Sequence, residues 1–166
     1  PVPRSGARPG NVVAVAGRLG WSAAGQAVLS RGFGTPKALV TAHRRPVPPY
    51  PAGPVAAELG ATAMCDVSDG LVQDLGHIAA ASGVRVELDT SALPVAEALA
   101  QVGAAFGGDP LRWVLAGGED HALVATFPDG TALGEGWTLI GKVGEGAGVV
   151  VDGRPYGDDG GWDHFR

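Results

Sequence analysis

Thr-Ala-Met-Cys-Asp-Val-Ser-Asp-Gly-Leu, residues 62–71, is the stretch that best indicates how this chain folds. Residues 62–67 are mostly apolar and predict a buried strand, which Ser68-Asp69-Gly70 then interrupts. A helix is expected to follow at once, because apolar residues recur with helical spacing at Leu71, Leu75, Ile78 and Ala79. Ser82-Gly83 is expected to end it. The stretch therefore predicts a strand–turn–helix unit with two carboxylates at the turn.

The remaining sequence also alternates between strand and helix patterns. Further strands are predicted at residues 12–16, 84–88, 121–127, 139–143 and 149–151, with a hairpin turn at Asp152-Gly153 into residues 154–156. Helices are predicted over residues 23–29, 55–59, 92–106 (mostly after Pro94) and 111–115, the first capped by Ser22 and the last by Asp109. Residues 44–54 are rich in proline and predict an extended connection. The expected fold class is α+β, a mixed β-sheet with packed helices.

Composition limits the classes of protein to which the chain can belong. Its 166 residues suffice for one domain or for a large part of a bigger enzyme, and 45% of them are hydrophobic. Only 17% are charged, against about 25% in typical soluble domains. Either part of the surface is normally covered by another domain, or the composition reflects a genomic bias toward Ala, Gly and Arg.

Charge and hydropathy argue against several partners and locations. The net charge of −5 disfavours a nucleic-acid groove. No apolar run approaches the roughly 18 residues of a membrane span, and residues 1–10 lack the layout of a signal peptide. One cysteine cannot form an internal disulfide. We therefore expect a cytoplasmic protein that binds neither membrane nor nucleic acid.

The turn after residues 62–67 carries the clearest chemical signal. Asp66 and Asp69 are three residues apart across a strand-to-helix turn, where two carboxylates can converge on a hard cation such as Mg²⁺. Ser68 and the helix N-terminal amides can meet a phosphate oxygen. The alternative is plain helix capping by Ser68 or Asp69. Capping does not explain Asp66, an acid that closes an apolar strand, so both interpretations remain open.

A second acidic signature, Gly117-Gly118-Glu119-Asp120, precedes the strand at residues 121–127. Two acids at a strand entrance can bind a cation, a hydroxyl or a metal, but a solvated turn is the simpler interpretation. His121 follows directly and can line the same site. Cys65 reads as a small buried strand residue, and Trp162 either packs the C-terminal segment or stacks on an aromatic ligand.

Several features expected of a complete nucleotide site are absent from the sequence. There is no GxxxxGK[ST] loop and no complete GxGxxG, and the chain contains only two lysines. The two acidic signatures therefore predict part of an active site, with the rest on a segment outside this chain.

Taken together, these residues resemble the C-terminal half of thiamine-monophosphate kinases, in the superfamily of aminoimidazole-ribotide synthetase and selenophosphate synthetase. The resemblance covers essentially the whole chain and is carried, in order, by Arg4-Ser5-Gly6-Ala7-Arg8-Pro9-Gly10, His43-Arg44-Arg45-Pro46, residues 65–74, Leu111-Arg112-Trp113, Ala116-Gly117-Gly118-Glu119-Asp120 and Asp163-His164-Phe165. The combination of Asp-x-Ser-Asp-Gly with Gly-Gly-Glu-Asp is the most specific part. Departures from the family pattern occur at Asn11, Pro49 and His121-Ala122.

The resemblance implies transfer of the γ-phosphate of ATP to thiamine monophosphate, with Mg²⁺ required and thiamine diphosphate formed. The roles that it implies are metal binding by Asp66 and Asp69, ATP binding by Arg4 and Ser68, and substrate binding by Glu119 and Trp162. It also implies that residues 1–166 form a single C-terminal domain. An N-terminal domain of the same enzyme would supply the other ligands and build a homodimer, so the chain by itself is expected to be inactive.

Two rival functions stay open at this point. One is an ATP-dependent synthetase of the same superfamily that acts on another phosphoacceptor. The other is a non-catalytic remnant that binds a nucleotide or a partner protein.

Overall fold

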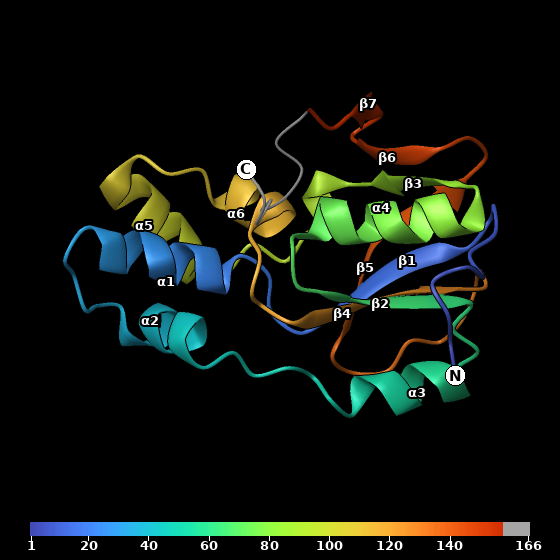
Figure 1. Cartoon of the computed structure of the whole chain (residues 1–166), viewed down its shortest axis with the longest axis horizontal. Coiled ribbons are helices and arrows are strands. Elements are labelled where there is room, and N and C mark those ends of the chain that lie inside the picture. The colour runs from blue at the N-terminus through green and yellow to red at the C-terminus, as the bar shows by residue number, and fades with distance from the viewer. Residues whose placement is uncertain (158–166) are drawn as a thin grey trace.

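A computed structural model of the chain, which describes residues 1–157, is built around one seven-stranded mixed sheet (Figure 1). The strand order is β2-β4-β1-β5-β3-β6-β7. The strands are β1 Val12–Ala16, β2 Ala63–Val67, β3 Arg85–Leu88, β4 Ala122–Phe127, β5 Trp137–Gly144, β6 Gly148–Val151 and β7 Arg154–Pro155. All neighbouring strands are antiparallel except β3 and β6, which are parallel. The expected α+β class with a mixed sheet is confirmed.

Strand β1 lies inside the sheet and is buried on both faces. Val13 and Val15 point into the main hydrophobic core, whereas Ala14 packs in a smaller cluster with Ala125 and Phe127. Because successive side chains of a strand point to opposite faces, a continuous apolar run such as Val12–Ala16 is the pattern that a doubly covered strand needs.

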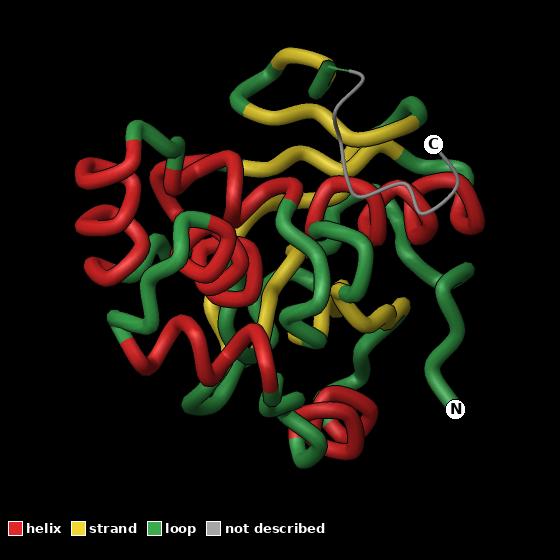
Figure 2. The backbone as a smooth tube through the Cα atoms, turned by 60° about the vertical axis from the view of Figure 1, so that its left-hand side comes forward, coloured by secondary structure: helices red, strands yellow, loops and turns green. Residues whose placement is uncertain are grey.

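In the described part of the chain six α-helices accompany the sheet, and Figure 2 shows how they are distributed around it. They are α1 Trp21–Ser30, α2 Lys37–Arg44, α3 Ala52–Glu58, α4 Leu71–Ser82, α5 Glu97–Phe106 and α6 Pro110–Ala116, and Thr90–Ala92 adds a 3₁₀ turn. Helix α4 lies across one face of the sheet, and α3 packs near β4 (Figure 1). The other four gather at one side of the sheet, where α1 contacts α2, α5 and α6.

The helices differ from expectation more than the strands do. All seven predicted strands are present, within two residues at each end, and Asp109 caps α6 through the amide of Leu111 at 2.9 Å. Helix α2 was not predicted, since it follows a Gly- and Pro-containing stretch and buries only Leu39 and Val40. Helix α5 begins at Glu97, shortly after Pro94, and ends at Phe106 as predicted. Within residues 1–157, no helix is long and apolar enough to cross a membrane.

Candidate functional site

The turn between β2 and α4 is organised by a buried carboxylate that the sequence analysis did not single out. One oxygen of Asp74 accepts hydrogen bonds from the amides of Ser68, Asp69 and Gly70 at 3.0, 3.0 and 3.1 Å. Asp74 is only 2% exposed. Burial raises the pKa of Asp74 while these amides act in the opposite direction. The segment 68–70 is therefore held by Asp74, from the first turn of α4.

This arrangement contradicts one of the two interpretations of Ser68 and Asp69, that of helix capping. Helix α4 begins after Gly70, which is its N-cap residue and has no side chain to cap with. Asp74 accepts the hydrogen bonds of the amides at this turn, so the prediction of simple helix capping by Ser68 or Asp69 was wrong. Their side chains are consequently available for another purpose.

The Gly-Gly-Glu-Asp loop lies directly beside this turn. The amide of Glu119 donates to the carbonyl oxygen of Ser68 at 2.7 Å, and the amide of His121 donates to that of Val67 at 3.0 Å. A Cβ atom at Gly118 would come within 2.7 Å of the Ser68 carbonyl oxygen, so only glycine fits there. Two signatures that are about 50 residues apart in the sequence are thereby joined through their backbones.

The same loop holds two non-glycine residues in the left-handed region. Glu119 has φ 66° and His121 has φ 52°, a conformation that costs free energy in residues with a side chain and that recurs at functional sites. The side chain of Glu119 is 57% exposed, and its carboxylate lies 3.6 Å from Nε2 of His121. Glu119 is therefore both fixed in its backbone and accessible to a ligand.

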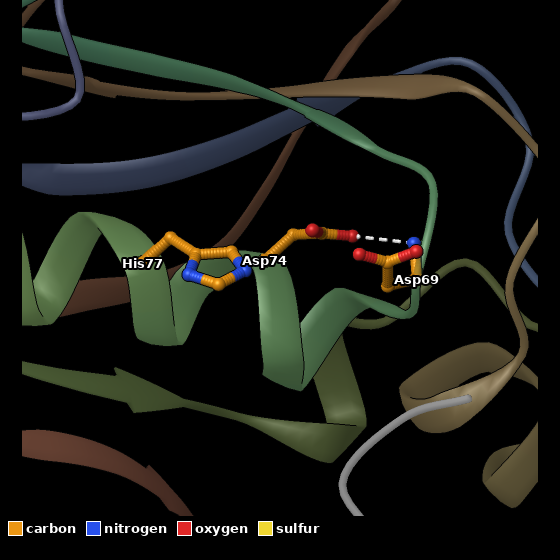
Figure 3. Close-up of side chains that lie close together, drawn as sticks. All are labelled: Asp69, Asp74 and His77. Atoms are coloured by element: carbon orange, nitrogen blue, oxygen red, sulfur yellow. Dashed lines mark hydrogen bonds between the residues drawn. The ribbon is translucent and has the colours of Figure 1, made fainter. Parts of the chain in front are cut away.

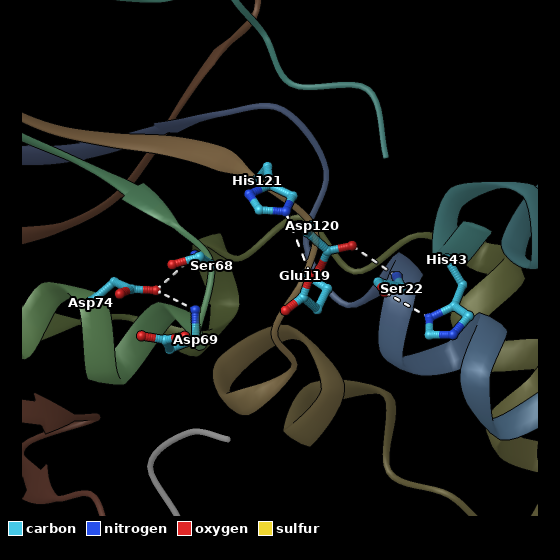
Figure 4. Close-up of polar contacts among 8 residues, drawn as sticks. All are labelled: Ser22, His43, Ser68, Asp69, Asp74, Glu119, Asp120 and His121. Atoms are coloured by element: carbon cyan, nitrogen blue, oxygen red, sulfur yellow. Dashed lines mark hydrogen bonds and ion pairs between the residues drawn. The ribbon is translucent and has the colours of Figure 1, made fainter. Parts of the chain in front are cut away.

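Asp120 points the other way, into the helical part of the molecule (Figure 4). Its carboxylate accepts from the amides of Gly20 and Ser22, the latter at 2.8 Å, and thus caps the N-terminus of α1. Burial raises its pKa to about 6, although these amides stabilise the charged form. The prediction that Ser22 caps this helix was wrong: Ser22 lies inside α1, and its hydroxyl is 3.0 Å from Nδ1 of His43.

Arg4 reaches the site from the N-terminal segment. The carbonyl of Pro3 accepts a hydrogen bond from Met64 at 3.1 Å, so this segment runs along the outer edge of β2. The Arg4 side chain lies beside Cys65. Burial raises the pKa of Cys65 to about 11 even though the charge of Arg4 opposes the shift, which confirms Cys65 as a buried strand residue rather than a nucleophile.

One group of potential metal ligands stands out in residues 1–157. Single ligand atoms of Asp69, Asp74 and His77 all lie within 4.8 Å of one another (Figure 3). His77 is the exposed member of this group. Asp66, next to last in β2, is exposed and is not a member of this group. The signal for Asp74 was its place four residues after Gly70, within the stretch that carries the resemblance.

The residue types at this turn are those that a hard divalent cation accepts as ligands. Carboxylate oxygens of Asp66 and Asp69 and the hydroxyl of Ser68 are the oxygen ligands that Mg²⁺ prefers, often together with substrate phosphates. Asp74 is already engaged by three amides, so it positions Asp69 rather than offering the same oxygen to a metal. Trp162, the other expected substrate contact, lies outside the described residues.

Comparisons with known proteins agree with this geometry. Residues 8–153 match the family described as AIR synthase related protein, C-terminal domain. A thiamine-monophosphate kinase of Mycobacterium tuberculosis is 50% identical over 167 residues, which cover 99% of this chain and 50% of that protein. The thiamine-monophosphate kinase of Corynebacterium glutamicum is 43% identical over 144 residues, covering 82% of this chain and 42% of that protein.

A solved structure supports the same relationship. AaThiL complexed with AMPPCP and TMP matches with a TM-score of 0.91 and 38% identity, over 99% of this chain and 54% of that one. The chain thus spans about half the length of the relatives that it matches. Since the family match extends over most of its residues, the chain belongs to the family of AIR synthase related proteins, C-terminal domain.

Proposed function

We propose that this chain supplies metal, ATP and substrate contacts of a thiamine-monophosphate kinase, which forms thiamine diphosphate from ATP and thiamine monophosphate. The observation that supports this most directly is the hydrogen bond from Glu119 to Ser68 at 2.7 Å, because it puts the candidate substrate contact beside the candidate ATP contact. The named relatives are thiamine-monophosphate kinases, and AaThiL is complexed with AMPPCP, an ATP analogue, and TMP.

Each candidate residue takes one role in this proposal. The assignments are Asp66 and Asp69 for Mg²⁺, Ser68 and Arg4 for ATP, and Glu119 and Trp162 for thiamine monophosphate. Asp74 positions the first group through the amides of residues 68–70. Bound Mg²⁺ would neutralise phosphate charge and help to hold donor and acceptor in line.

The need for cations follows from the reaction. Both the phosphate donor and the acceptor are anions, and two unit charges at ~4 Å repel by about 4 kcal/mol at an effective dielectric constant of ~20. No general base is required, because the acceptor oxygen is already ionised. The task of the protein is therefore to bind, orient and neutralise, and Arg4 contributes a positive charge beside Cys65, which precedes Asp66 in β2.

The remaining part of the site is proposed to come from an N-terminal domain of the same enzyme. Two carboxylates supply too few ligands for several metal ions, and the relatives are about twice as long as this chain. Tyr50, 80% exposed, is apolar surface that such a domain can cover. We also propose that the complete enzyme is a homodimer that works in the cytoplasm, where ATP is made available.

The test is a mass-spectrometric assay for thiamine diphosphate, made with the complete enzyme, ATP, Mg²⁺ and thiamine monophosphate. We expect product from the wild type and none from Asp69→Ala, whose fold is checked by circular dichroism. Asp129→Ala is the matched control, since Asp129 is an exposed aspartate in a loop after β4. Near-normal turnover of Asp69→Ala overturns the assignment of Asp69 to the metal. A wild type that phosphorylates only another acceptor overturns the assignment of thiamine monophosphate as the substrate.

A further inference from the structure

A cavity of about 390 Å³ lies on the side of the Gly-Gly-Glu-Asp loop that faces α1 and α2. Its wall includes three cations, two apolar side chains and one acid, namely Arg18, Lys37, Arg45, Trp21, Val47 and Asp120. Glu119 and Asp120 are adjacent but face opposite ways, so the loop separates this cavity from Ser68 and Asp69 (Figure 4). Nothing in the proposed kinase chemistry uses the cavity.

The three cations make the cavity electropositive in a chain whose net charge is −5. Among residues 1–157, no carboxylate forms an ion pair with Arg18, Lys37 or Arg45. The one acid in the wall, Asp120, directs its oxygens to the amides of Gly20 and Ser22. The N-terminus of α1 therefore compensates the charge of Asp120, and the charges of the three cations are available to a ligand.

The cavity is also partly preorganised. The guanidinium of Arg18 lies over the ring of Trp21, with 4.4 Å between its carbon and the ring centroid. Stacking holds the guanidinium plane and leaves the N–H groups at its edge free to bind an oxyanion. The remaining cations come from different places on one segment: Lys37 starts α2 and Arg45 follows its end.

Apolar surface lies next to these charges. Trp21 is half-buried, and Val47 is 82% exposed although it is a large aliphatic residue. An exposed valine beside an aromatic ring suits a ligand with a flat apolar portion, whereas a bare inorganic anion gains nothing from it. A volume of about 390 Å³ falls in the range of small-molecule pockets.

We propose that this cavity binds a phosphate monoester that carries an aromatic ring, with the phosphate at Arg18, Lys37 and Arg45 and the ring against Trp21 and Val47. The proposal does not depend on the proposed kinase activity. It requires neither Mg²⁺ nor the residues assigned to ATP and thiamine monophosphate.

The experiment measures binding of phenyl phosphate and of inorganic phosphate to the chain in EDTA, by calorimetry and by the indole N–H resonance of Trp21, assigned with Trp21→Phe. EDTA removes divalent cations, so binding at Asp66 and Asp69 through a metal does not contribute. We expect phenyl phosphate to bind more tightly than inorganic phosphate and to shift the Trp21 resonance. The double variant Lys37→Ala/Arg45→Ala should weaken binding about tenfold or more, since it removes two charge-assisted contacts.

Two matched variants make the test decisive. Arg44→Ala removes an exposed cation next to Arg45 that does not line the cavity, and should change affinity less than about twofold, as a solvent-exposed charge does. Arg4→Ala should leave the affinity unchanged, because Arg4 lies at the candidate ATP site. An equal loss in Arg44→Ala, a loss confined to Arg4→Ala, or an unshifted Trp21 resonance overturns the proposal, whatever the outcome of the kinase assay.

Discussion

The amide of Glu119 donates a hydrogen bond to the carbonyl oxygen of Ser68 at 2.7 Å. Strands β2 and β4 pair in register up to Val67 and Ala122, and this bond continues their pairing into the loops beyond. The two acidic signatures are thus placed by the sheet itself. The side chains of Asp69 and Glu119 need no direct contact with each other and can both face a ligand, whereas Asp120 turns to α1.

Gly118→Ala tests how closely the two loops must approach. The added methyl group would lie 2.7 Å from the Ser68 carbonyl oxygen, which is itself held by the Glu119 amide. We expect the free energy of unfolding to fall by about 1–3 kcal/mol, as for other overpacked substitutions. Urea denaturation measures the change.

A glycine with open space around it provides the comparison. Gly76 lies inside α4, and a Cβ atom there would meet nothing within 4 Å. Gly76→Ala should raise the free energy of unfolding by up to about 1 kcal/mol, since alanine favours a helix over glycine. If both substitutions stabilise the protein, the close approach of Gly118 to Ser68 is not as described.

Asp74→Ala tests the carboxylate that holds the β2–α4 turn. Three amides lose their common acceptor, and each buried unpaired amide costs about 1–3 kcal/mol where water does not replace the partner. We expect a clear loss of stability in chemical denaturation. Asp74→Asn keeps one acceptor oxygen and should lose less, so equal small losses in both variants would contradict this role.

Much of the fold was predictable, because its determinants are local. Strand β1 is a continuous apolar run between Asn11 and Gly17, and the Asp152-Gly153 turn joins β6 to β7 as predicted. Helix α2 was missed because a short helix with two buried residues leaves little periodic signal. The local pattern is informative only where a strand or helix buries a whole face.

The residue types of the candidate site could be read from the sequence, but the long-range contacts that position these residues could not. The spacing of Asp66 and Asp69 is visible in a few letters of sequence, but in the structure Asp69 groups with Asp74 and His77 and not with Asp66. The contact from Asp120 to the amide of Ser22 spans 98 positions, and no local rule connects an acid near one strand to the start of a distant helix. Likewise, the sequence suggests Ser22 as the cap of α1, and only the tertiary structure shows that the carboxylate of Asp120 caps this helix instead.

Cys65 provides a test that is independent of activity. The thiol is 5% exposed, and burial raises its pKa to about 11, so the reactive thiolate is scarce at neutral pH. We expect iodoacetamide at pH 7.5 to leave the folded chain unmodified over a period that fully labels the chain in urea. Intact-mass spectrometry measures the modification, and rapid labelling of the folded chain would falsify the buried placement.

Asp120 predicts a specific dependence of stability on pH. Its pKa is about 6 in the folded chain, chiefly because of burial, against about 4 in an unfolded one. A carboxyl group with a raised pKa binds its proton more tightly when folded, so its contribution to stability is complete below pH 4 and is lost as the pH rises through 6. The shift corresponds to a change on the order of 3 kcal/mol.

Asp120→Asn separates this effect from the other carboxyl groups. Asparagine does not titrate, yet its side-chain oxygen can still accept from the amide of Gly20 or Ser22. We therefore expect the difference in unfolding free energy between wild type and variant to move in favour of the variant as the pH rises from 4 to 7, and to be flat above 7. A difference that stays constant from pH 4 to 7 would mean that Asp120 titrates as an ordinary surface acid and is not buried against α1.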